Sequence, residues 1–81
     1  MSELSEKVLM ITKSFMGPAS QNFLERQTRS HMKGLEFNDL RNEHLPELLK
    51  WLSVSAKLII DDKAENMVKR MEAVLNVKRA V

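Results

Sequence analysis

Residues 46–60, PELLKWLSVSAKLII, are the most apolar stretch of the chain and decide its fold. With successive residues about 100° apart on a helix, two apolar stripes lie side by side and leave only a narrow polar line. The first stripe, which starts just before this stretch, consists of Leu45, Leu48, Leu49, Leu52, Ala56, Ile59 and Ile60, and the second consists of Trp51, Val54 and Leu58. A helix this apolar is normally buried on several sides. We predict a central helix over about 46–60.

Helical periodicity also appears on both sides of this stretch. Residues 3–16 carry apolar side chains at helical spacing, as do a segment from residue 18 to about 33 and a last segment that begins after Asp61 or Asp62. Asn38 and Asp39 offer a cap for a short helical turn through Leu40. We expect residues 76–81 to fray. No apolar-polar alternation is long enough for a strand, so the sequence predicts an all-α fold, a compact bundle of four main helices plus one short helix.

Gly17-Pro18 is the break between the first two of these helices. Glycine takes the left-handed conformation that closes a helix, and proline suits the first turn of the next one. A phosphate-binding loop would need several glycines and a Lys-Ser/Thr pair, whereas the whole chain has two glycines. We interpret Gly17-Pro18 as a structural corner.

Length and composition limit the class of protein. The 81 residues are 43% hydrophobic and 30% charged, which is typical of a globular domain and not of a disordered segment. A chain this short is expected to form one domain over residues 1–81. It contains no cysteine, which excludes disulfides and thiolate metal sites. The net charge of +2 is small for a dedicated nucleic-acid binder.

Two features favour a cytoplasmic location. No run reaches the roughly 18 uncharged apolar residues of a membrane span, because Lys57 interrupts residues 51–60. Glu3 and Glu6 precede any apolar run, so the basic start of a secretory signal is missing. We expect a cytoplasmic protein that does not contact a membrane.

Residues suited to catalysis or metal binding are few. His31 and His44 are the two histidines, and they lie on different predicted elements, outside any i,i+4 ligand pair. The serines lack the Gly-x-Ser-x-Gly environment of a hydrolase nucleophile. We therefore expect no enzymatic activity, no catalytic residue, no metal, no cofactor and no small-molecule substrate.

A basic face on the second helix offers one binding function. Arg26, Arg29 and Lys33 are spaced three and four apart, so they could contact successive phosphates of a nucleic acid. The modest net charge and the lack of exposed aromatic residues for base stacking argue against this. Nucleic-acid binding through these residues is therefore the alternative hypothesis.

The second stripe of the central helix offers the leading hypothesis. Trp51, Val54 and Leu58 are either covered by another helix of the same chain or form a contact surface for a second chain. Tryptophan often dominates the energetics of such contacts. We predict a small protein-protein interaction or regulatory module, a homodimer or a docking piece for a larger protein, with these three residues at the interface.

Two segments resemble known proteins. KSFMGPASQNFLERQ, residues 13–27, resembles small helical Gly-Pro-Ala-containing modules associated with bacterial and archaeal signalling proteins. HLPELLKWLSVSAKLIID, residues 44–61, resembles the downstream core helix of small bacterial proteins of similar length. The resemblance implies a compact helical fold with an accessory or regulatory role, and it transfers no site residue to this chain.

Overall fold

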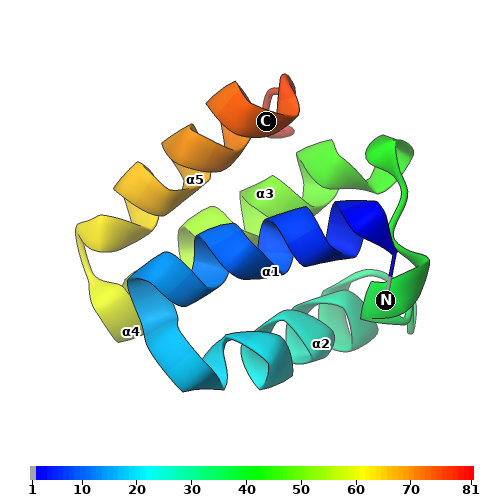
Figure 1. Ribbon diagram of the computed structural model, residues 1–81, viewed down its shortest axis with the longest axis horizontal. Coiled ribbons are helices and arrows are strands. Elements are labelled where there is room, and N and C mark those ends of the chain that lie inside the picture. The colour runs from blue at the N-terminus through cyan, green and yellow to red at the C-terminus, as the bar shows by residue number, and fades with distance from the viewer. Residues whose placement is uncertain (1) are drawn as a thin grey trace.

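The computed structural model describes residues 2–81. These residues form helices and turns without a β-strand, which confirms the all-α prediction. The α-helices are α1 (Glu3–Met16), α2 (Ser20–His31), α3 (Leu45–Ser55), α4 (Lys57–Ile60) and α5 (Lys63–Leu75) (Figure 1). The 3-10 helices are η1 (Gly17–Ala19), η2 (Phe37–Asp39) and η3 (Asn42–His44).

The predicted corner between the first two helices is confirmed in the structure. Gly17 has φ 67°, and its N–H group donates to the Lys13 carbonyl at the end of α1. The second helix was predicted to begin at Pro18, but residues 17–19 form η1 and α2 begins at Ser20. The Ser20 hydroxyl donates to the Gly17 carbonyl over 2.7 Å, which fixes this tight turn.

The predicted continuous helix over 46–60 is wrong in one respect, because it is interrupted at Ala56 between α3 and α4. Ala56 keeps helical torsions, with φ −67° and ψ −28°, so the interruption is local. One turn earlier, the Ser53 hydroxyl donates to the Lys50 carbonyl over 2.7 Å, a contact that competes with regular helical bonding. The expected set of four main helices plus one short helix therefore does not hold in that form.

The connection between α2 and α3 also differs from the prediction. The second helix ends at His31 instead of about residue 33, because Lys33 and Gly34 have positive φ values of 57° and 75°. The short turn predicted to reach Leu40 is η2, and η3 was not predicted. Phe37 of η2 is buried in the core, which anchors this connection to the helices.

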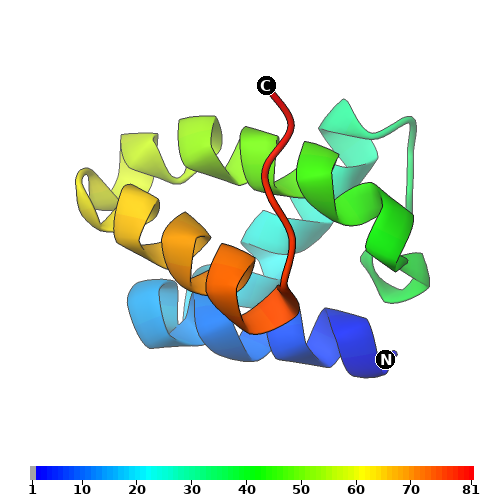
Figure 2. The same ribbon diagram turned by 90° about the horizontal axis from the view of Figure 1, so that it is seen from above.

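The core lies between α1 and α3, which are bridged on one side by α5 and on the other by α2 (Figures 1 and 2). Leu48, Leu49, Leu52 and Ala56 of the central segment are fully buried. The largest side chains with less than 2% exposure also come from the other helices and from η2, and they include Val8, Leu24, Phe37, Met67, Val68 and Met71. The apolar faces predicted for the four long segments therefore meet in a single core.

The C-terminal segment does not fray as predicted. Asn76 closes α5 in the left-handed conformation, with φ 53°. The following residues return across the bundle toward the start of α3, where the Ala80 N–H group donates to the Pro46 carbonyl over 2.8 Å (Figure 2). Val77 packs against the core on the way. We refer to residues 76–81 as the tail.

Candidate functional site

The far end of the α3–α4 segment exposes apolar side chains. Val54 is 57% exposed, Leu58 87% and Ile59 62%, although Leu52 and Ala56 beside them are fully buried. We call Val54, Leu58 and Ile59 the apolar corner. Two of the three predicted interface residues, Val54 and Leu58, belong to it.

Trp51, the third predicted interface residue, is half-buried. Its ring stacks on that of His31 from α2, with the centroids 4.3 Å apart and the planes 13° from parallel. The Lys50 ammonium lies 4.9 Å from the indole centroid, and the indole Nε1 lies 3.5 Å from a carboxylate oxygen of Glu47. The chain itself therefore covers part of Trp51, whereas it leaves Val54 and Leu58 exposed.

A groove adjoins the apolar corner. It has a volume of about 560 Å³. Its walls come from three parts of the chain: the end of α1 together with η1, the first turns of α2, and α4. Its apolar lining consists of Phe15, Met16, Ala19, Phe23, Leu58, Ile59 and Ile60. Leu58 and Ile59 therefore belong both to the corner and to the wall of the groove. Sequence reasoning missed this groove because its residues come from separate elements.

Gln27 lies in the polar part of the groove wall. It is only 8% exposed, and its Oε1 atom accepts no hydrogen bond from residues 2–81. Phe23 and Leu24, one turn earlier on the same face of α2, are also buried. The structure shows a buried amide whose oxygen lacks a partner, which is uncommon because buried polar groups are normally hydrogen-bonded.

The three basic residues of the alternative hypothesis have different surroundings. Arg26 is exposed and lines the groove. Arg29 forms an ion pair with Glu36 over 2.9 Å, and the hydrogen bond from this pair raises the pKa of Arg29. Lys33 is exposed beyond the end of α2. With Arg29 already paired to a carboxylate, nothing in this arrangement favours nucleic-acid binding, which stays a prediction.

A cluster of charged side chains fixes the tail. The Arg79 guanidinium donates to both carboxylate oxygens of Glu65 over 2.8 Å each and to Glu72 over 3.0 and 3.1 Å. The Arg79 backbone N–H group also donates to Glu72, over 3.0 Å. These hydrogen bonds lower the pKa of Glu72 from 4.5 to about 2, lower that of Glu65, and raise that of Arg79. We call Arg79, Glu65 and Glu72 the tail clasp.

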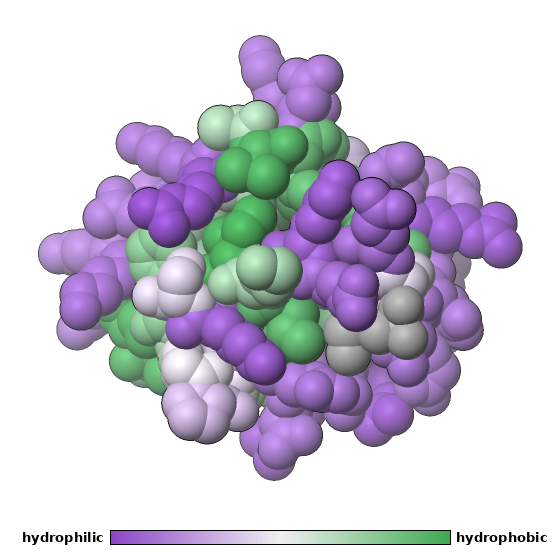
Figure 3. Space-filling model, viewed as in Figure 1, coloured by the Kyte–Doolittle hydropathy of each residue, from purple (hydrophilic) through white to green (hydrophobic). Residues whose placement is uncertain are grey.

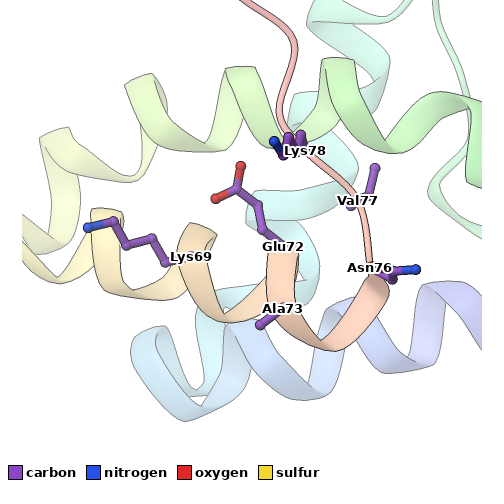
Figure 4. A pocket seen from close by; sticks show the side chains of 6 residues that line it. All are labelled: Lys69, Glu72, Ala73, Asn76, Val77 and Lys78. Carbon is purple, nitrogen blue, oxygen red and sulfur yellow. The ribbon is translucent and has the colours of Figure 1, made fainter.

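The hollow beside the tail clasp is shallow and has little chemistry to offer. Figure 4 shows it between α5 and the tail, with the Glu72 side chain directed toward the tail and Lys69 and Lys78 among the lining residues. Its volume is about 590 Å³. The carboxylate in its wall is that of Glu72, which already accepts hydrogen bonds from Arg79. We therefore interpret this hollow as a result of how the tail is attached to α5.

The face formed by α1 and α5 provides a contrast. Figure 3 shows apolar patches there that are separated by hydrophilic side chains. Arg70 of α5 places its guanidinium 5.0 Å from the ring centroid of Phe15 at the end of α1, a cation-π geometry. Arg70 thus covers part of Phe15, which is half-buried.

The two histidines serve separate local contacts. His31 stacks on Trp51, and His44 Nδ1 accepts a hydrogen bond from the Arg41 N–H group over 2.9 Å, which closes η3. In residues 2–81 no three His, Asp or Glu side chains come together as metal ligands would. Over the same residues, no helix has the length and apolar character needed to cross a bilayer.

No protein-family model, curated protein or solved structure matches the chain. The resemblance to helical modules of signalling proteins is therefore still an expectation. The function has to be argued from the corner and the groove.

Proposed function

We propose that this chain is a small helical interaction module that self-associates through the apolar corner. The observation that carries the proposal is the exposure of Leu58, at 87%, on a segment whose neighbouring Leu52 is fully buried. Exposed single leucines are common, but here Val54 and Ile59 extend the apolar surface, and a groove borders it. Contiguous apolar surface of this kind is typical of contact sites.

The shape of the surface favours a second copy of the chain as the partner. Leu58 and Ile59 project from α4 directly beside the groove that they line. In a two-fold symmetric contact, the same patch of both copies meets, so a projection next to a hollow can complement itself. Each copy would place its projecting side chains toward the hollow of the other.

Charges at the rim of the corner also suit this pairing. Lys57 begins α4, and Asp61 follows its last residue, and both side chains are exposed. When two α4 helices meet in antiparallel orientation, the lysine of one copy approaches the aspartate of the other. Burying one leucine contributes about 1.5 to 3 kcal/mol, and association costs offset much of the total. We therefore expect a dimer of micromolar affinity.

Analytical ultracentrifugation tests the proposal at protein concentrations from about 1 to about 300 µM, the range over which a dimer held by about −6 kcal/mol, a dissociation constant of tens of micromolar, forms. The wild-type chain should change from monomer to dimer over this range. Val54→Glu and Leu58→Glu should remain monomeric, with unchanged helicity by circular dichroism.

Met10→Glu is the matched control, because Met10 is also exposed, at 71%, but lies on α1 outside the corner and the groove. This variant should dimerise like the wild type. A wild-type chain that stays monomeric throughout, or a Met10→Glu variant as defective as Leu58→Glu, would contradict self-association through the corner.

A further inference from the structure

We propose that Arg26 pairs with Asp62 of the second copy and thereby fixes the antiparallel orientation of the two chains. This inference rests on the self-association proposed above, and it names the residues that select the partner and its direction. Three observations carry it: a cation in the groove wall and carboxylates at the end of α4 that have no ion-pair partner within residues 2–81, and the direction of α2 along the groove.

Arg26 supplies the cation. In the described part of the chain, it is the one charged side chain of the groove wall. It is exposed and forms no ion pair with an acidic residue of residues 2–81, whereas Arg29, three residues later on α2, is bonded to Glu36. A guanidinium without a carboxylate beside it favours an acidic group on the chain that enters the groove.

The end of α4 supplies the carboxylates. Asp61 and Asp62 follow Ile60, both are exposed, and neither forms an ion pair within residues 2–81. Asp61 has a positive φ of 51°, which ends α4 sharply. Asp62 precedes α5, and its side chain makes no capping hydrogen bond there. Both carboxylates can therefore bond to a second chain without losing a partner in their own.

The direction of α2 shows at which end of the groove Arg26 lies. α2 runs antiparallel to α3 (Figure 1), and the stacked rings of His31 and Trp51 place these two residues opposite each other. Gln27, four residues earlier on α2, and Ser55, four residues later on α3, both line the groove. Arg26, next to Gln27, therefore lies near Ser55, at the end of the groove where α4 begins.

An antiparallel pair of α4 helices brings the end of one helix beside the beginning of the other. In this arrangement Asp61 of the second copy approaches Lys57, which leaves its Asp62 for Arg26. A two-fold axis repeats every contact, so the dimer contains two Arg26–Asp62 pairs. In a parallel arrangement Asp62 would lie at the opposite end, near Ala19, where the described groove wall has no charged side chain.

Charge reversal tests the pair, with analytical ultracentrifugation of the full chain as the measurement. Arg26→Asp alone and Asp62→Arg alone each create two like-charge contacts, so we expect either variant to dimerise about ten-fold more weakly than the wild type. An equimolar mixture of the two variants should dimerise with wild-type affinity, because both contacts in the mixed dimer then join opposite charges. A chain that carries both substitutions should also dimerise like the wild type.

Lys33→Asp is the matched control. It reverses the charge of an exposed residue just beyond the end of α2, outside the groove wall, and should leave dimerisation unchanged. Circular dichroism should show the same helicity for all variants.

Two results would overturn the pair while self-association through the apolar corner stands. The first is a wild-type dimer whose affinity is unchanged in Arg26→Asp. The second is a loss of affinity in both single variants that neither the mixture nor the doubly substituted chain restores. A wild-type chain that stays monomeric would contradict self-association itself and the pair with it, so the two failures are distinguishable.

Discussion

The two ends of the α3–α4 segment share one sequence pattern but have different surroundings. At the first end the tail returns over α3, bonded from Ala80 to Pro46 and held by the tail clasp. At the other end no segment within residues 2–81 covers Val54, Leu58 and Ile59. The apolar pattern of this segment is wider than one buried face, and its surplus side chains are exposed at the end that no other described segment covers.

Shortening Leu52 and Leu58 in separate variants should reveal the largest difference between the two ends. Leu52 is fully buried and Leu58 is 87% exposed on the same segment. Leu52→Ala should lower the free energy of unfolding by about 3 kcal/mol, since it removes methyl groups and leaves a cavity. Leu58→Ala should change it by less than about 0.5 kcal/mol.

Urea denaturation of both variants at a few micromolar protein, where we expect monomers, measures this difference. Similar losses for the two leucines would mean that Leu58 is covered by the chain in solution, and the contrast between the two ends would be wrong.

The next largest effect should come from the tail clasp. Arg79→Gln should lower the free energy of unfolding by about 1 to 2 kcal/mol at neutral pH, because Glu72, with its side chain 23% exposed, loses charge-assisted hydrogen bonds. The pKa of Glu72 is depressed from 4.5 to about 2, so its stabilising contribution is present above pH 4.5 and is lost as the pH falls toward 2.

Thermal unfolding between pH 2 and 7 should show this acid-dependent loss in the wild type and a weaker one in Arg79→Gln. Lys78→Gln is the control, because Lys78 is an exposed tail residue that forms no ion pair within residues 2–81. Identical pH profiles for the wild type and Arg79→Gln would contradict a role of the clasp in holding the tail.

A smaller effect, of opposite sign, should come from Gln27. Gln27→Met should raise the free energy of unfolding by about 1 kcal/mol, since it removes a buried oxygen that has no partner within residues 2–81. Urea denaturation measures this change. A Gln27→Met chain less stable than the wild type would show that the amide is hydrogen-bonded in solution.

Much of the fold could be predicted from local sequence patterns. The periodic spacing of apolar residues predicted α1 in residues 3–16 and α5 in the segment after Asp62, and Gly17-Pro18 predicted the corner, because these signals depend on neighbours within one or two turns. The same reasoning placed Val54 and Leu58 in a second apolar stripe, because their angular positions around the helix differ from that of Leu52.

Contacts between distant residues could not be predicted in this way. Arg79 binds Glu65, fourteen residues earlier, so residues 76–81 resembled a free end. The groove combines the end of α1, the start of α2 and α4, and its residues share no spacing in the sequence. His31 covers part of Trp51 only because the packing of α2 on α3 brings the two rings together.

The most direct test of the account is a dilution series followed by ¹H–¹⁵N NMR. If two copies meet at the apolar corner, raising the concentration should shift the resonances of Val54, Leu58 and Ile59. Those of Glu72 and Ala80, which lie under or within the tail, should stay unchanged. Shifts centred on the tail, or no concentration dependence at Leu58 up to about 300 µM, well above the dissociation constant expected for a micromolar dimer, would contradict it.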